Sequence, residues 1–240
     1  MEDLGDRLLL DELGPETVSE LYGRALDTLS QVQKVDPSPL PAYSREVLGE
    51  ELARFPEWFC EALLGRPLGD ARALFEAFSG QLLASAAEQP VVFVHRDFHS
   101  RNLLLCADDD LGIIDFQDAV AGPLCYDLVS LLKDCYIRWP REQVLEWVES
   151  YRARACPAVE AAIFVRWFDW LGLQRHVKVL GNFARLAVRD GRDGYLADLP
   201  LVLDYIREVL ALYPEHHAFA DWFASELEPL IAAQPWSRQP

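Results

Sequence analysis

Long apolar runs, paired cysteines and an excess of basic residues are all missing from this sequence, and each absence excludes a class of protein. No stretch reaches the ~18 apolar residues of a membrane-spanning helix. The opening MEDLGDRLLLDEL is acidic and does not resemble a signal peptide. Lysine and arginine number 22 against 39 acidic residues, for a formal net charge of −17. We therefore expect neither a nucleic acid nor a membrane as partner.

The five cysteines are widely spaced and form no CxxC pair. Four of them lie among apolar neighbours, at positions 60, 106, 125 and 135, as small buried side chains do. This usage is typical of a reducing compartment and favours a cytoplasmic protein. A hydrophobic content of 51% and a charged content of 25% are ordinary for a soluble globular chain.

Apolar periodicity predicts a mainly helical chain with a small β element in its middle. Helices are expected over 15–33, 44–64, 70–87, 124–137, 140–155, 158–189 (with a possible break near Gly172 or Gly181), 200–213 and 216–232. Short strands are expected at 91–95, 103–106 and 112–116. The fold class is therefore α+β, mainly α. Polar residues cluster at the ends of the strands, where scaffolds usually display functional groups.

The stretch VVFVHRDFHSRNLLL (91–105) contains a His-x-Asp-x-His pattern at His95, Asp97 and His99. Alternate residues of an extended segment share a face, so the spacing permits a zinc site. A closed zinc site needs three or four ligands in suitable geometry. The remaining histidines, at 176, 216 and 217, form no matching cluster, so zinc is disfavoured.

The same stretch matches the requirements of phosphoryl transfer. Asp97 is followed by Asn102 and later by Asp115 in IIDF. Kinases need a carboxylate that orients the attacking hydroxyl, together with an amide and a second carboxylate that hold Mg²⁺ on the phosphates of ATP. A hairpin formed by 103–106 and 112–116 would bring Asn102 and Asp115 to the same end.

The segment VHRDFHSRNLLL followed by LGIIDFQDAVAGPLCYDLVSLL resembles the aminoglycoside-phosphotransferase-like kinases, the small-molecule branch of the protein-kinase fold. The resemblance implies an ATP-dependent kinase in which Asp97 is the catalytic base and Asn102 and Asp115 are the Mg²⁺ ligands. It also implies supporting residues for the catalytic loop, namely His95, His99 and Asp127. A transfer from ATP to a small-molecule hydroxyl is the expected reaction.

The charged residues near the loop are expected to have structural or surface roles as well as, or instead of, catalytic ones. Asp127 matches the Asp-Leu that opens the next helix in the family, although an acid that merely interacts with the helix dipole is an equal interpretation. Asp118 is expected to be a surface acid. Arg96 and Arg101 are expected to be structural or to face solvent.

RWFDWLGLQRHVKVLGNFARL (166–186) and the opening MEDLGDRLLLDEL resemble the anomeric sugar kinases, which phosphorylate N-acetylmuramate and N-acetylglucosamine at C1 in peptidoglycan recycling. Residues 166–189 carry five basic residues and one acidic residue, which suits an anionic sugar. The candidate substrate-binding residues are Trp167, Asp169, Arg175 and Lys178. A core helix with snorkelling basic residues is the alternative for each of them. Aminoglycoside phosphorylation and a non-catalytic binding module remain alternatives for the whole chain.

The sequence contains no Gly-rich phosphate loop and no strand lysine of the kinase N-terminal lobe, since Lys34 ends a helix. We therefore expect a C-terminal lobe whose N-terminal lobe is absent from this chain. Either Met1 is an internal methionine of a longer protein, which is the favoured expectation, or the lobe stands alone. In this interpretation residues 1–14 are a hinge-like segment, in which the backbone of Glu2, Asp3 and Leu4 meets adenine. The C-lobe spans 15–240, with the catalytic loop and metal-binding hairpin at 91–118 and substrate-side helices at 124–232. The 240-residue chain alone is expected to bind ATP weakly.

Overall fold

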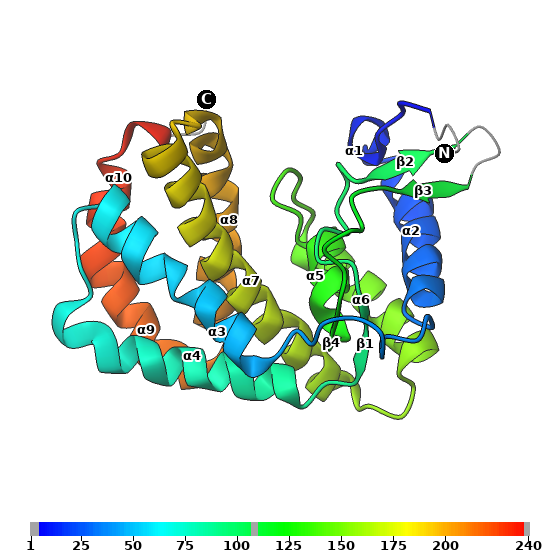
Figure 1. Cartoon of the computed structure of the whole chain (residues 1–240), viewed down its shortest axis with the longest axis horizontal. Coiled ribbons are helices and arrows are strands. Elements are labelled where there is room, and N and C mark those ends of the chain that lie inside the picture. Colours follow the sequence, from blue (N-terminus) through cyan, green and yellow to red (C-terminus); the bar gives the residue numbers. More distant parts are fainter. Residues whose placement is uncertain (1–4, 107–109, 238–240) are drawn as a thin grey trace. The chain divides into compact units, whose positions relative to one another are not determined.

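The computed structural model describes residues 5–106 and 110–237, so the expected hinge residues Glu2, Asp3 and Leu4 lie outside the described residues. The described chain is mainly helical and contains two small antiparallel sheets of two strands each (Figure 1). This architecture confirms the predicted mainly α fold with a β-hairpin. None of the helices in the described ranges is long and apolar enough to cross a membrane.

The chain divides into two compact units. The loop unit comprises residues 1–43 and 89–168, and the helical unit comprises 44–88 and 169–240. The candidate catalytic loop lies in the loop unit. The helix α7 (Ala161–Asp190) supplies residues to both units and is unbroken, so the possible break near Gly172 or Gly181 is absent.

The loop unit is built on helices that bury one apolar face. Its elements are α1 (Leu9–Glu12), α2 (Val18–Val32), β1 (Val91–Val94), β2 (Leu103–Leu105), β3 (Leu111–Ile113), β4 (Val120–Pro123), α5 (Cys125–Leu132) and α6 (Arg141–Ala155). Apolar side chains of α2 recur at helical spacing and are buried where this helix contacts α5 and α6. Tyr22 packs edge-on against Trp147, with ring centroids 5.0 Å apart.

The hairpin of β2 and β3 forms as predicted, with Leu103 opposite Ile113 and Leu105 opposite Leu111. Figure 1 shows the hairpin beside α1 and α2, which contact β2 and β3 respectively. The residues before α1 pair with the free edge of β2 in this hairpin, because the N–H of Leu105 donates to the carbonyl oxygen of Arg7 at 2.9 Å. The segment before α1 is thereby anchored next to the catalytic loop.

The fourth strand, β4, was not predicted, and it pairs antiparallel with β1. Its sequence Val-Ala-Gly-Pro resembles a turn, because Gly and Pro are both depleted in strands. The pairing requires a small residue here. A Cβ at Gly122 would lie 2.9 Å from the Cβ of Tyr43, which donates its backbone N–H to the carbonyl oxygen of Ala121 on the same strand at 2.7 Å.

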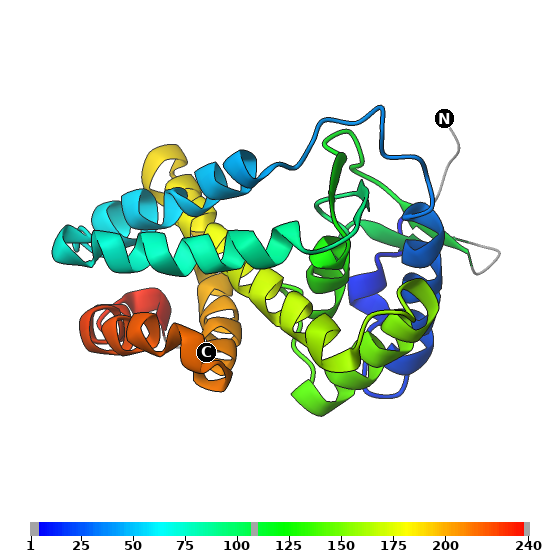
Figure 2. The same cartoon turned by 90° about the horizontal axis from the view of Figure 1, so that it is seen from below.

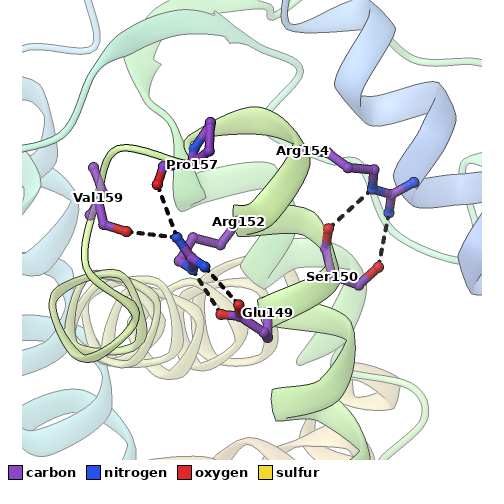
Figure 3. Close-up of polar contacts among 6 residues, drawn as sticks. All are labelled: Glu149, Ser150, Arg152, Arg154, Pro157 and Val159. Carbon is purple, nitrogen blue, oxygen red and sulfur yellow. Dashed lines mark hydrogen bonds and ion pairs between the residues drawn. The ribbon is translucent and has the colours of Figure 1, made fainter.

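Arg152 fixes the turn between α6 and α7 (Figure 3). Its guanidinium pairs with both carboxylate oxygens of Glu149, each at 2.7 Å. It also donates to the carbonyl oxygens of Val159 at 2.8 Å and Pro157 at 3.4 Å. The Arg152 side chain therefore satisfies two loop carbonyl oxygens and links them to Glu149 in the last turns of α6.

The helical unit contains α3, α4 and the later helices. Its elements are α3 (Arg45–Leu52), a π-helix (Phe55–Leu63), a 3₁₀ turn (Gly69–Ala71), α4 (Arg72–Ala87), the second part of α7, a 3₁₀ helix (Asp193–Asp198), α8 (Leu199–Leu212), a 3₁₀ turn (Pro214–His216), α9 (His217–Trp222), a π-helix (Phe223–Leu227), α10 (Glu228–Ala232) and a 3₁₀ turn (Pro235–Ser237). Figure 2 shows α3 and α4 side by side, in agreement with their contacts. Phe78 stacks on Phe219 at a ring distance of 3.9 Å in the core.

The single helix predicted over 44–64 is instead α3 followed by a π-helix. Ser44 caps its start as predicted, accepting the N–H of Val47 at 3.4 Å. The change of helix type falls where Pro56 removes a backbone donor. Arg54 at this junction lies against α7, where a Cβ on Gly181 would come within 2.6 Å of its carbonyl carbon. Gly181 therefore marks a close backbone approach.

Candidate active site

The candidate catalytic residues lie at the ends of β1, β2 and β3, all in the loop unit. Asp97 follows β1, Asn102 precedes β2 and Asp115 follows β3. The side-chain N–H of Asn102 donates to the carbonyl oxygen of Asp97 at 3.0 Å. The backbone N–H of Ile114, next to Asp115, donates to the carbonyl oxygen of Asn102 at 3.1 Å. The hairpin thus brings Asn102 and the Asp115 segment together, as the spacing predicted.

Two residues of this cluster have left-handed backbone conformations, at φ +69° for Asp115 and φ +76° for Arg96. Such conformations cost non-glycine residues free energy and concentrate at functional sites. Asp115 is exposed, and one of its carboxylate oxygens accepts a hydrogen bond from Gln117 at 2.6 Å. The conformation turns the chain sharply after β3, directly next to Ile114, whose backbone is bonded to Asn102.

The residues present fit a magnesium ion. The amide nitrogen of Asn102 is bonded to Asp97, so the oxygen of the same amide faces away from that carbonyl. A neutral oxygen and the Asp115 carboxylate are hard ligands, and Mg²⁺ in kinases is held by one or two such groups together with phosphate oxygens. Within residues 5–106 and 110–237, no group of three or more His, Cys, Asp or Glu side chains could hold a metal ion.

The two loop histidines pack against different aromatic rings. His95 is buried edge-on against Phe98, with ring centroids 6.1 Å apart. His99 is half-buried edge-on against Tyr136 at 5.5 Å. Burial lowers the pKa of His95, although Asp97, a backbone hydrogen bond at Ile114 and Asp115 act in the opposite direction. The balance keeps its imidazole neutral at neutral pH.

Asp127, near the start of α5, holds the first half of the loop. Its fully buried carboxylate accepts the backbone N–H of His95 at 2.6 Å and that of Arg96 at 3.0 Å. Two charge-assisted bonds to the residues just before Asp97 fix the loop backbone there. These contacts are specific to the loop and go beyond an interaction with the helix dipole.

Asp134 holds the second half of the loop, and the sequence pattern alone did not single it out. One oxygen of its buried carboxylate accepts both the backbone N–H of Ser100 at 3.0 Å and the Ser100 hydroxyl at 2.5 Å. The other oxygen accepts the N–H of Tyr136 at 3.1 Å. The signal was an acid seven residues after Asp127, at the end of CYDLVSLLKD, in which most of the other residues are apolar. In a helix this spacing is about two turns, so two such acids are expected on one face.

The candidate substrate-binding residues all lie on α7 and are buried. Trp167 belongs to the loop unit and Asp169, Arg175 and Lys178 to the helical unit. Asp169 accepts the hydroxyl of Tyr213 at 2.9 Å. Lys178 forms an ion pair with buried Glu51 at 3.0 Å, which balances part of the positive charge of 166–189.

The sequence model of the phosphotransferase enzyme family matches residues 1–165. The chain belongs to this family.

The chain is similar to curated proteins of one name within this family. The chain is 43% identical, over 90% of its length, to the N-acetylmuramate/N-acetylglucosamine kinase of Neisseria meningitidis. It is 40% identical, over 98% of its length, to the protein of that name from Pseudomonas aeruginosa. These alignments cover 67% and 69% of the two relatives, so the chain spans about two thirds of their length.

Two solved structures show the same fold. The ADP-bound aminoglycoside phosphotransferase APH(2'')-Ib is 15% identical with a TM-score of 0.54, and the match covers 85% of this chain and 70% of that one. The gentamicin complex of APH(2")-IIa is 14% identical with a TM-score of 0.56, covering 88% and 69%. The described chain therefore has the kinase-like fold of these enzymes.

Proposed function

We propose that this chain carries the catalytic part of an ATP-dependent, Mg²⁺-requiring sugar kinase. The acceptor is the anomeric C1 hydroxyl of N-acetylmuramate or N-acetylglucosamine, and the product is a sugar 1-phosphate. The observation that carries the proposal is the identity of 40–43% with kinases of this name over at least 90% of the chain. Aminoglycoside phosphorylation has weaker support, because the structures that suggest it are only 14–15% identical.

Asp97 is the residue that orients the acceptor. Its half-buried side chain lies on a loop whose backbone is bonded on both sides of it, at His95 and Arg96 by Asp127 and at Ser100 by Asp134. In our proposal its carboxylate accepts a hydrogen bond from the C1 hydroxyl. It takes up the proton as the C1 oxygen bonds to the γ-phosphorus of ATP and the bond from that phosphorus to the leaving ADP oxygen breaks. Positioning contributes most of the effect, since the transition state of phosphoryl transfer is loose.

Asn102 and Asp115 hold the metal ion in this proposal. The ion, when bound, neutralises charge on the transferred phosphoryl group. The bond from Asn102 to the Asp97 carbonyl couples the metal side of the loop to the acceptor side. The backbone of Glu2, Asp3 and Leu4 is proposed to contact adenine, and these residues lie outside the described ranges.

The proposed contacts to the sugar come from buried residues of α7. Asp169 is proposed to bind a sugar hydroxyl in exchange for, or together with, its present bond to Tyr213. Trp167 and Arg175 are each proposed to contact the sugar. Lys178 has the weakest support, because its charge is already balanced by Glu51.

A substrate comparison tests the function. The 240-residue chain, and the same chain extended upstream of Met1, are incubated with ATP, Mg²⁺ and either N-acetylmuramate, N-acetylglucosamine or kanamycin. With the extended chain, phosphorus NMR should show a signal coupled to the anomeric proton with both sugars and no product with kanamycin. The 240-residue chain alone should give much less product. Transfer to kanamycin alone would identify an aminoglycoside kinase, and sugar binding without transfer would identify a non-catalytic module.

The variant Asp97→Asn tests the role of the Asp97 carboxylate, because it removes the charge and keeps the size of the side chain. It should abolish transfer, by at least about a thousandfold, while leaving the circular dichroism spectrum and the unfolding midpoint close to wild type. Near-normal turnover in this variant would remove Asp97 from the mechanism. Robust activity of the 240-residue chain alone would contradict the expectation that it binds ATP weakly.

A further inference from the structure

Arg101 is an exposed cation in the catalytic loop, one residue before Asn102. Its guanidinium carbon lies 3.5 Å from the centroid of the Tyr136 ring. In the part of the chain that the structure describes, no acidic side chain pairs with it. A guanidinium stacked on a ring keeps its N–H groups at the edge, where a planar anion can bind two of them.

The ring under Arg101 is itself fixed to the loop. The backbone N–H of Tyr136 donates to Asp134, whose carboxylate also binds Ser100 beside Arg101. His99 packs edge-on against the same ring at 5.5 Å. The cation and its aromatic support are therefore held by one buried carboxylate, and Arg101 is placed before any ligand arrives. Such preorganisation reduces the entropy lost on binding.

Arg101 and Asn102 leave the chain in different directions. The amide of Asn102 lies against the Asp97 carbonyl, and the guanidinium of Arg101 lies over Tyr136. If Asn102 faces the metal and the phosphates, then Arg101 faces another side of the same loop, four residues from Asp97. In an in-line transfer the acceptor occupies the side opposite the leaving nucleotide. Arg101 thus lies on the loop of Asp97, on a side where it would not compete with Asn102 for the phosphates.

We infer that Arg101, supported by Tyr136, binds the carboxylate of N-acetylmuramate and so determines how the enzyme ranks its two sugars. This inference rests on the proposed function. N-acetylmuramate carries a lactyl ether with a carboxylate at C3, and N-acetylglucosamine carries a hydroxyl there. A chain of net charge −17 repels an anionic sugar, so the acidic substrate requires a local cation. Lys178, the earlier candidate for this role, already pairs with Glu51.

The test compares the two sugars in one enzyme. Arg101→Gln in the chain extended upstream of Met1 should raise KM for N-acetylmuramate roughly tenfold or more, with little change in kcat, because a charge-assisted contact is lost from the bound sugar. KM for N-acetylglucosamine should change less than about twofold. Arg101→Lys should restore part of the affinity for N-acetylmuramate, because it keeps the charge and loses the planar fork.

The salt dependence and a control variant distinguish binding of the sugar carboxylate by Arg101 from a nonspecific effect of removing a positive charge. Raising the ionic strength should increase the wild-type KM for N-acetylmuramate and leave that for N-acetylglucosamine nearly constant, a difference that Arg101→Gln removes. Lys34→Gln removes an exposed charge on the same unit, where the ammonium group donates to the amide oxygen of Gln31, and should leave both KM values unchanged.

Equal effects of Arg101→Gln on both sugars, or no effect on either, would overturn the inference while leaving the kinase assignment intact. A wild-type enzyme that phosphorylates neither sugar would overturn the proposed function itself. The two failures are therefore distinguishable in the same set of assays.

Discussion

Ser100 gives both of its donors to a single carboxylate oxygen of Asp134, the backbone N–H at 3.0 Å and the hydroxyl at 2.5 Å. Both residues are buried, at 0% and 1% exposure. Ser100 lies three residues after Asp97, so this pair holds the loop on the side that leads to Asn102. The geometry of the catalytic loop therefore depends on a residue that reaches no substrate.

Removing the two partners should have unequal effects. Ser100→Ala loses one hydrogen bond and should cost about 1 kcal/mol of unfolding free energy, with a several-fold lower kcat. Asp134→Ala leaves three donors without their partner and should cost about 3 kcal/mol or more. Urea unfolding measures both, with Glu142→Gln on α6 as a control expected within about 0.5 kcal/mol of wild type, because Glu142 is exposed. Equal losses in the two variants would contradict the shared role of this carboxylate.

Variants of the ion pair between Lys178 and Glu51 test whether Lys178 stabilises the fold or binds the substrate. Both side chains are largely buried, at 11% and 2% exposure. Lys178→Met or Glu51→Gln alone should therefore destabilise the protein by about 3–5 kcal/mol, because each removes one partner of a buried ion pair.

The double variant Lys178→Met, Glu51→Gln should lose clearly less than the sum of the single changes. Thermal or chemical unfolding of the four proteins gives the coupling free energy. A Lys178→Met variant with unchanged stability and a much higher KM for sugar would instead return Lys178 to the substrate site.

His216 should make the protein sensitive to acid. Burial lowers its pKa to about 4, opposed by the charge of Glu215. Its ring faces Trp170 at 4.4 Å and Phe78 at 5.3 Å, and its Nδ1 lies 3.1 Å from the amide oxygen of Gln81. The unfolded chain takes up a proton near pH 6.5 and the folded chain only near pH 4, so protonation favours unfolding.

Stability should consequently fall as the pH drops from about 6.5 to about 4, by up to roughly 3 kcal/mol from this group. The lowered pKa of His95 acts in the same direction. Unfolding midpoints measured from about pH 7 to about pH 4 should show a shallower decline for His216→Gln than for wild type. His217→Gln, next to it and exposed, is the matched control and should preserve the full slope.

Two glycines in helices should respond oppositely to alanine. At Gly181 a Cβ would lie 2.6 Å from the carbonyl carbon of Arg54, so Gly181→Ala should cost at least about 2 kcal/mol. At Gly80 in α4 nothing lies within 4 Å of the new Cβ, so Gly80→Ala should stabilise the helix by about 0.5–1 kcal/mol. Differential scanning fluorimetry of the two variants checks the sign. A tolerated Gly181→Ala would disprove the close approach of α7 to residue 54.

The sequence predicted the parts of this fold that are encoded locally. The catalytic loop and the hairpin were found because the spacing of Asp97, Asn102 and Asp115 carries chemical meaning and strand alternation is a local signal. The strand β4 was missed, since Val-Ala-Gly-Pro becomes a strand only through its pairing with β1. The role of Asp134 was missed for the same reason, because Ser100 lies 34 residues earlier in the chain. The pairing of Lys178 likewise depends on a residue from another helix.

Asp127 and Asp134 tie the length of α5 to the geometry of the candidate catalytic loop, because one lies near its start and the other just beyond its end. The first carboxylate binds His95 and Arg96, and the second binds Ser100. Each residue inserted into a helix rotates the residues after it by about 100° and advances them by about 1.5 Å. A single insertion or deletion between the two acids would turn one of them away from the loop. The number of residues between Asp127 and Asp134 is therefore constrained by helix geometry. The apolar residues within this interval can be exchanged for other apolar residues more freely than they can be added or removed.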